Sequence, residues 1–449
     1  MNKRIGIIGE NSIGYIETLL NIWNAGDCAV LIDWRIPMKT AIEMLEEASV
    51  EICYIEEHIF SKNSFNSNNE IEFRLYNQIN DSAEVLPFDI YNKFNENYSK
   101  KEAVIIYSSG TTGKSKGIIL SHYAININSD AIIDYMKPEE SDCIYIVKTL
   151  SHSSTLTGEL IVALKSRMKL IIAPSIMTPR IVFQNIKKFN VTILCVNPKL
   201  LSMYCEEYVL DRYKPLSLKK IYVSGSILNE KEYLKANETL INIEIYNVYG
   251  LSEAGPRVAA QRVCRRNNSV GKPIKGVEII IVNDKGIPVD VNEKGILHVK
   301  TSSIFDGYVL GELKFQSLYK NWLNTGDIGY LDEEDELHIV DRIDDVIIID
   351  SHKIYPSEVE KVIMEYESIK DCVVSYDIKS QKLICVYKSY GKDDIRLDAL
   401  IRHCSKKICS YEMPRIWKKV DLINRTINGK VLRYNNLVNI ERNIDHDKL

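Results

Sequence analysis

Short apolar runs alternate with amphipathic stretches along most of this chain, and this alternation restricts the folds that it can adopt. Residues 4–9 (RIGIIG) and 28–33 (CAVLID) are typical of buried strands, whereas 12–26 has apolar residues at helical spacing and ends at a glycine. The same pairing recurs with a helical pattern over 180–190 and a strand pattern over 191–196. Strands that alternate with helices predict an α/β fold with largely parallel sheets.

The pattern changes twice toward the C-terminus. Residues 269–330 hold short apolar runs separated by Asn-Asp-Lys-Gly and Asn-Glu-Lys-Gly turns, which predict antiparallel strands. The last hundred or so residues predict an α+β unit with a helix that begins at Pro356. We therefore expect a large N-terminal domain over 1–343, with parallel and mixed sheets and a β-rich part at about 269–343. A small mobile α+β domain is expected over 345–449.

Composition argues against several classes of protein. The net charge of −4 gives no basic field, so no nucleic acid partner is expected. No apolar stretch approaches the roughly 20 residues that span a bilayer, and Glu10 and Asn11 interrupt the first apolar run. The 10 cysteines are scattered without a C-x-x-C pair, as in reduced thiols. We expect a cytoplasmic protein with neither a membrane span nor a signal peptide.

Residues 105–117 (IIYSSGTTGKSKG) combine hydroxyl residues, glycines and lysines in a way that suits phosphate binding. A P-loop would need its first glycine where Ser108 stands, and a helix directly after the lysine. Here the residues after Lys116 predict a strand, and the next helix is expected only after Ser121, an N-cap residue. The segment therefore joins two strands, which disfavours a P-loop nucleoside triphosphatase.

Together with three later segments, this loop resembles the acyl-adenylate-forming superfamily. That superfamily includes acyl- and aryl-CoA ligases, luciferases and the adenylation domains of peptide synthetases. The matching segments are YSSGTTGKSKG (107–117), NVYGLSEAG (247–255), the Thr-Gly-Asp to Asp-Arg stretch at 322–347, and NRTINGKVLRYNNL (424–437). The family usually has proline where this loop has Ser115. The resemblance runs from about residue 5 to the C-terminus.

The resemblance implies roles for single residues. Tyr249 would stack near the adenine, and Glu253 would hold Mg²⁺ near the phosphates. Asp327 would accept the ribose hydroxyls, and Arg342 would contact ribose or phosphate. The other nucleotide-binding and phosphate-binding candidates are Ser108, Ser109, Gly110, Thr111, Thr112, Gly113, Lys116, Asn247, Gly250 and Ser252, of which Thr112 is also a catalytic candidate.

The final segment implies a catalytic lysine and a hinge. Lys430 would arrive from the C-terminal domain and bridge the substrate carboxylate and the α-phosphate. Asp344 would be the hinge about which that domain rotates between two half-reactions. Each residue also fits a plainer role by itself: Glu253 as a carboxylate at a helix start, Asp327 as a turn residue, and Lys430 as a solvated loop lysine. Their shared order and spacing favours the nucleotide site.

Residues 149–160 (TLSHSSTLTGEL) resemble the segment of acyl-CoA ligases in which a histidine lines the acyl entrance. His152 matches that histidine, although it also fits a polar residue at a strand end. Adenylation domains of peptide synthetases place an aspartate nearby to bind an amino group, and no acid lies between Thr149 and Gly158. A plain carboxylic acid is therefore expected. Pocket walls are expected from 197–204, 224–228 and 249–250.

The resemblance implies ATP-dependent activation of a small carboxylic acid as acyl-AMP, followed by transfer to a thiol. ATP, Mg²⁺ and either CoA or the phosphopantetheine of an acyl carrier protein would take part. The family usually has glycine where this chain has Asp350-Ser351, in a loop that borders the thiol tunnel. A non-thiol acceptor therefore stays open, as does a nucleotide-binding partner protein that has lost catalysis.

Overall fold

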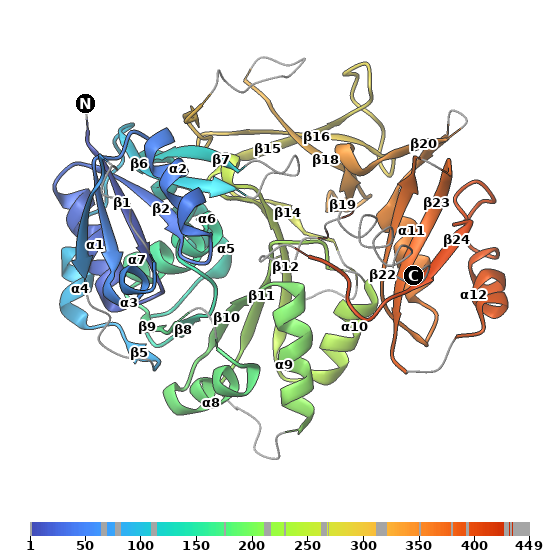
Figure 1. Ribbon diagram of the computed structural model, residues 1–449, viewed down its shortest axis with the longest axis horizontal. Helices are drawn as coiled ribbons and strands as arrows, with labels where there is room; N and C mark the ends of the chain where they lie inside the picture. Colours follow the sequence, from blue (N-terminus) through green and yellow to red (C-terminus); the bar gives the residue numbers. More distant parts are fainter. Residues whose placement is uncertain are drawn as a thin grey trace, which may run out of the picture.

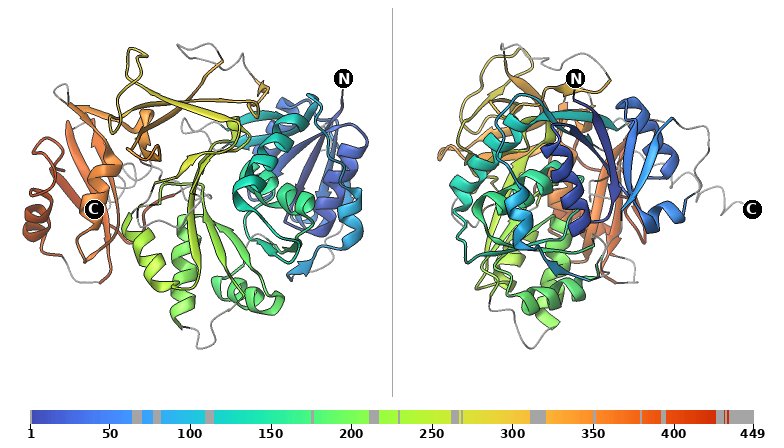
Figure 2. Two further views of the ribbon diagram at one scale, coloured as in Figure 1. Left: turned by 180° about the vertical axis from the view of Figure 1, so that it is seen from behind. Right: turned by 90° about the vertical axis from the view of Figure 1, so that its left-hand side faces the viewer.

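The computed structural model describes most of the 449 residues. The described residues are 2–63, 70–76, 82–108, 115–174, 177–210, 217–228, 230–261, 267, 269–310, 321–349, 352–378, 380–391, 395–425, 431 and 433. Figures 1 and 2 show two large sheets with their helices at one end of the molecule and a smaller C-terminal unit at the other.

The first sheet has seven strands in the order β17-β7-β6-β2-β1-β3-β4. Its strands are β1 (Arg4–Gly9), β2 (Cys28–Asp33), β3 (Ile52–Glu56), β4 (Glu72–Tyr76), β6 (Glu102–Ser108), β7 (Lys116–Ser121) and β17 (Gly307–Tyr308). Strands β1 to β4 and β6 run parallel, whereas β7 is antiparallel to both of its neighbours. The associated helices are α1 (Ile13–Asn24), α2 (Met38–Glu47), α3 (Glu57–Ser61), α4 (Phe88–Lys93) and α5 (His122–Met136).

The second sheet has eight strands in the order β14-β13-β12-β11-β10-β8-β9-β5. They are β5 (Glu84–Val85), β8 (Cys143–Ile146), β9 (Lys169–Ile172), β10 (Ile193–Val196), β11 (Lys220–Val223), β12 (Glu244–Gly250), β13 (Arg257–Ala260) and β14 (Lys272–Pro273). The five central strands are parallel. Its helices are α6 (Ser153–Thr155), the π-helix η1 (Leu156–Ile161), α7 (Val162–Ser166), α8 (Pro179–Phe189), α9 (Pro198–Leu210) and α10 (Glu230–Thr239).

One apolar core joins the two sheets. Its buried side chains include Leu31 and Ile118 of the first sheet, Ile144 of the second, and Ile132 of α5 and Leu160 of η1 between them. The helix α5 begins where the sequence predicts, because the Ser121 hydroxyl accepts a hydrogen bond from the Ala124 N–H at 3.2 Å. No described helix is long and apolar enough to cross a membrane.

A third, antiparallel sheet follows, with strands β15 (Val277–Val282), β16 (Gly295–Thr301), β18 (Leu323–Leu331) and β19 (Leu337–Arg342). The β-rich segment predicted from the sequence does not form this sheet alone. Its strand β14 pairs with β13 in the second sheet, and β17 pairs with β7 in the first. The segment therefore connects all three sheets, which brings residues far apart in the sequence to one place.

The C-terminal unit is a separate α+β arrangement with its own apolar core. Its elements are the turn η3 (Ile343–Asp345), β20 (Ile347–Ile349), β21 (His352–Ile354), α11 (Pro356–Met364), β22 (Ile369–Asp377), β23 (Lys382–Ser389), α12 (Leu397–Cys404) and β24 (Ile416–Lys419). Buried side chains of α11, the sheet β22–β24 and α12 pack together, among them Val359, Val374 and Leu400. The α/β fold predicted from the strand–helix alternation is confirmed.

Candidate active site

The C-terminal end of β12 holds Tyr249 against two residues of the third sheet. The Tyr249 hydroxyl donates to one carboxylate oxygen of Asp327, and Nη1 of Arg342 donates to the other at 3.0 Å. Asp327 and Arg342 face each other because they are register partners in the antiparallel pair β18–β19. Three residues predicted to hold the nucleoside therefore lie in one contact group.

The charges in this group are fixed by burial and by the shared carboxylate. Burial raises the pKa of Tyr249 well above its usual range, and Asp327 raises it further. Burial alone would lower the pKa of Arg342, but the charge and hydrogen bond of Asp327, together with Tyr249 and Asp344, outweigh burial and raise it. Tyr249 is thus a neutral donor and Arg342 a cation. Each Asp327 oxygen keeps a second lone pair, which suits a ribose hydroxyl.

We expect Asp327→Asn to raise the KM for ATP by about 10- to 100-fold, because a hydrogen bond to a charged group is worth about 1.5–3 kcal/mol. The amide also places a donor where Tyr249 or Arg342 already donates. Initial rates with ATP varied at saturating acid measure the change. Asp332→Asn is the matched control, since that carboxylate pairs with His338 instead. An Asp327→Asn variant with the wild-type KM for ATP would contradict the assignment.

Glu253 lies in the short turn η2 (Ser252–Ala254), directly after β12. Its Oε1 accepts a hydrogen bond from the Tyr308 hydroxyl at 3.0 Å. The Lys116 Nζ lies 5.3 Å from the centre of the same Tyr308 ring. Tyr308 reaches both residues because β17 pairs with β7, where it is the register partner of Ile118. The predicted magnesium ligand and the predicted phosphate lysine therefore share one aromatic neighbour.

Ser252 connects this segment to the predicted entrance for the acid. Its hydroxyl oxygen lies 2.7 Å from that of Ser153. Ser153 directly follows His152, whose Nε2 is 4.0 Å from Oδ2 of Asp33. Burial would raise the pKa of Asp33, but the hydrogen bonds and charge of Arg35 outweigh burial and lower it. Asp33 is therefore an anion beside His152.

Two further predicted residues of β12 have structural reasons for their position. A Cβ on Gly250 would lie 2.1 Å from the Pro256 carbonyl oxygen, so only glycine allows this approach. Asn247 is buried, and its N–H donates to Oε1 of Gln261 at 2.8 Å. Both residues thus fix the end of the strand that carries Tyr249.

The ends of the predicted phosphate loop are held together. Ser108 and Lys116 are register partners in the antiparallel pair β6–β7, as expected for a loop that joins two strands. Asp344 lies in η3, between the third sheet and the C-terminal unit. The other predicted residues lie outside the described part of the chain: Ser109, Gly110, Thr111, Thr112, Gly113 and Lys430, together with Asp350 and Ser351.

A family model described as AMP-binding enzyme matches residues 1–309. The chain belongs to the AMP-binding enzymes. This membership confirms the predicted resemblance to the acyl-adenylate-forming superfamily.

The relatives of this AMP-binding enzyme include a CoA ligase and an acyl-CoA synthetase. A 2-succinylbenzoate–CoA ligase of Bacillus mycoides is 26% identical over 446 residues, which cover 96% of this chain and 87% of the relative. Acyl-CoA synthetase 7 of Caenorhabditis elegans is 26% identical over 343 residues, covering 73% of this chain and 63% of the relative.

Two solved structures share the fold. The anthranilate CoA ligase AuaEII in complex with anthranoyl-AMP matches 98% of this chain and 87% of its own, with a TM-score of 0.85 and 20% identity. ATP-bound MatB from Rhodopseudomonas palustris matches 99% and 90%, with a TM-score of 0.85 and 19% identity. Both similarities are similarities of fold, that is, of the arrangement of helices and strands.

The site of this AMP-binding enzyme fits the Mg²⁺ that accompanies ATP. Mg²⁺ prefers hard oxygen ligands and usually binds one or two carboxylates together with substrate phosphates and waters. The Glu253 carboxylate, close to the predicted phosphate lysine, Lys116, offers one such ligand. Across the described ranges, no group of three or more His, Cys, Asp and Glu side chains could hold a metal alone. A cation held jointly with the nucleotide suits this donor set.

Sequence reasoning missed two residues of this AMP-binding enzyme. Tyr308 gave no local signal, since it joins the site through pairing between strands far apart in the chain. Asp33 did have a local sequence signal, because it is a polar residue at the carboxyl end of the parallel strand β2. Ligands of α/β proteins bind at such strand ends.

Proposed function

We propose that this chain activates a small carboxylic acid with ATP and transfers the acyl group to a thiol, with Tyr249, Asp327 and Arg342 holding the nucleoside. The observation that carries the proposal is the convergence at the end of β12. Tyr249 of this strand contacts the nucleoside group, and Ser252 in the turn η2 that follows contacts the acid entrance. Glu253 of the same turn reaches the proposed phosphate lysine, Lys116, through Tyr308. An acid and a nucleoside triphosphate would meet at this segment.

In the first half-reaction, a carboxylate oxygen of the acid attacks the α-phosphorus of ATP. The new O–P bond forms as the bond to the bridging oxygen of the β-phosphate breaks, and pyrophosphate leaves. Because an anion attacks a polyanion, the site has to supply positive charge along the reaction path. Lys116 and Lys430 supply fixed charges, and Mg²⁺ neutralises the phosphates when it is bound with ATP.

In the second half-reaction, the thiol sulfur attacks the acyl carbon. The carbon–oxygen bond to AMP breaks, a thioester forms, the thiol proton is lost and AMP leaves. CoA is the proposed acceptor, in line with the named CoA ligases among the relatives, and the phosphopantetheine of a carrier protein is the alternative. A cytoplasmic location belongs to the same proposal, since the expected reduced thiols suit that compartment.

The proposed domain boundary lies at Asp344. Its support is that no cluster of buried apolar side chains in the described residues crosses this position. The contacts across it are polar instead. Helix α11 and the hairpin β20–β21 before it make three ion pairs with the N-terminal part. They are Glu358 with Lys294, Lys361 with Glu230, and Lys353 with Asp284. Rotation of the C-terminal unit about Asp344 would break these ion pairs and allow different polar contacts to form.

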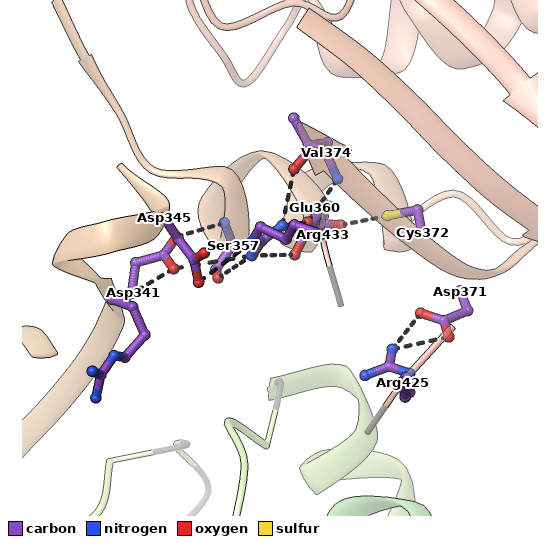
Figure 3. A network of polar contacts seen from close by, with 10 residues as sticks. Asp341, Asp345, Ser357, Glu360, Asp371, Cys372, Val374, Arg425 and Arg433 are labelled. Atoms are coloured by element: carbon purple, nitrogen blue, oxygen red, sulfur yellow. Dashed lines mark hydrogen bonds and ion pairs between the residues drawn. The ribbon is translucent and has the colours of Figure 1, made fainter. Parts of the chain in front are cut away.

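Arg433 lies three positions after Lys430 and reaches both sides of the proposed hinge. Its guanidinium is within ion-pair distance of Asp341, at 4.0 Å, and of Asp345, at 3.5 Å. Figure 3 shows it surrounded by these carboxylates, Ser357 and Glu360. Arg433, which follows the proposed catalytic lysine by three positions in the sequence, therefore lies next to the proposed hinge.

Acid-dependent exchange of labelled pyrophosphate into ATP tests the first half-reaction. A panel of aliphatic, aryl and amino acids is assayed, and the nucleotide product is identified. We expect exchange with non-amino carboxylic acids and AMP as the product, followed by thioester when CoA is added. Formation of ADP, or no exchange with any acid, would overturn the proposal. Exchange without thioester for any thiol would instead favour a non-thiol acceptor.

A further inference from the structure

Arg257, the first residue of β13, is a buried cation inside the N-terminal part of the chain. Only 5% of the residue is exposed, and its Nε is buried without a hydrogen bond. Its backbone is well satisfied, since its N–H donates to Oδ1 of Asn128 and its carbonyl accepts from Nδ2, both at 2.9 Å. Among the residues that the structure describes, none forms a hydrogen bond or ion pair with the guanidinium. Buried arginines are normally paired.

The groups around Arg257 carry too little negative charge to balance it fully. The nearby carboxylate of Glu159, in the π-helix η1, attracts Arg257 but also lies 3.0 Å from Nζ of Lys148, so two cations share it. Tyr135 and Cys195 also face Arg257, and burial raises the pKa of both, to about 12 for Cys195, so both stay neutral. Two cations thus surround one carboxylate. The interior here carries an excess positive charge.

Arg257 lies between the two segments that are expected to hold the acid. In the pair β12–β13 it is the register partner of Gly250, next to Tyr249. A Cβ placed on Gly158 would lie 3.3 Å from Nη2 of Arg257. Gly158 belongs to the segment that begins with His152 and touches Ser252 through Ser153. The π-helix that carries Gly158 is itself a rare geometry that is frequent at functional sites.

We propose that Arg257 binds a second carboxylate of the substrate, so that this enzyme activates dicarboxylic acids. The inference rests on the proposed function and narrows its substrate class. A planar guanidinium with free N–H groups matches a carboxylate in a bidentate manner. A substrate that ends in a methyl group would leave Arg257 buried and unpaired, and such a site rejects the analogue that lacks the binding group.

The test compares acids of equal length in pyrophosphate exchange. Each α,ω-dicarboxylic acid is paired with the monocarboxylic acid that ends in a methyl group, in an aliphatic and an aryl series. For the wild type we expect kcat/KM to be about 10- to 100-fold higher for the diacid of the preferred length. We expect Arg257→Met to lose this preference because its kcat/KM for the diacid falls while that for the monocarboxylic acid is kept. Arg257→Lys should keep part of the preference.

Lys165→Met is the matched control. Lys165 is also a buried cation near η1, but it pairs with Asp130 and Glu96, away from the site. We expect this variant to keep the wild-type preference for diacids even where its stability falls. The wild-type comparison alone remains decisive if Arg257→Met does not fold.

Three outcomes would overturn the inference. Equal kcat/KM for the two members of every pair in the wild type would mean that ordered water, not substrate, satisfies the guanidinium. A preference that survives in folded Arg257→Met would place the second carboxylate elsewhere. These two results leave the proposed function intact, whereas absence of exchange with every acid overturns both.

Discussion

Replacing Lys430 with alanine is expected to lower acid-dependent pyrophosphate exchange by about 100- to 1,000-fold, the usual effect of removing one group that stabilises a developing charge. The lysine would bridge the attacking carboxylate and the α-phosphate, and its ammonium group is most valuable when the two anions meet. Thiolysis of a supplied acyl-AMP should stay within about threefold of the wild type, since rotation about the proposed hinge would remove this lysine before the second step. Single-turnover assays of each half-reaction measure the two effects separately.

Lys406→Ala provides the control for Lys430, because Lys406 is an exposed lysine of the same C-terminal unit. It should leave both half-reactions unchanged. An equal loss of adenylation and thiolysis in Lys430→Ala would show that the substitution disturbs the whole domain. In that case the lysine would have no separate role in the first step.

Arg433→Met is expected to destabilise the C-terminal unit by about 3–5 kcal/mol, the cost of leaving a buried charge without its partner. The Arg433 guanidinium pairs with Glu360 and donates to the Val374 carbonyl at 2.9 Å. Burial raises the pKa of Glu360 and Arg433 lowers it, so loss of the arginine raises it further. Protonation then removes the buried charge, and the destabilisation should shrink as the pH falls.

Hydrogen exchange of the amides in β22 and β23 reads this local stability without unfolding the larger domain. The double variant Arg433→Met/Glu360→Met removes both charges and should recover most of the lost protection. If Arg433→Met lowers the stability of the C-terminal unit by less than about 1 kcal/mol, the Arg433–Glu360 pair contributes no more than an exposed ion pair. A double variant no more protected than the single one would also contradict the account.

The sequence predicts the parts of this molecule that depend on local patterns. The strand–helix alternation, the N-cap at Ser121 and the loop between two strands are all confirmed, because neighbouring residues decide them. The resemblance to the acyl-adenylate-forming superfamily also singles out Tyr249, Asp327 and Arg342, which the structure brings into contact. Their roles toward the nucleotide remain predictions.

What the sequence does not predict depends on pairing at long range. Tyr308 joins Glu253 only because β17 adds to the edge of β7, and a two-residue strand gives no periodic signal. In the sequence, Arg257 is indistinguishable from an ordinary charged residue after a turn. Its burial results from packing among α5, η1 and β10, which are distant in the sequence. An unpaired charge becomes visible only when all its neighbours are known.

The contacts between the two parts of the chain include the ion pairs made by α11 and the hairpin β20–β21, and no apolar cluster of the described residues is shared between the parts. The heat-capacity change of a rearrangement follows the apolar surface that it exposes. Breaking these contacts should therefore change the heat capacity very little. The enthalpy difference between the two domain orientations should then be nearly independent of temperature. Solvent-exposed charges are screened within about 10 Å at 0.1 M salt. Ionic strength is the variable that should shift the balance between the half-reactions.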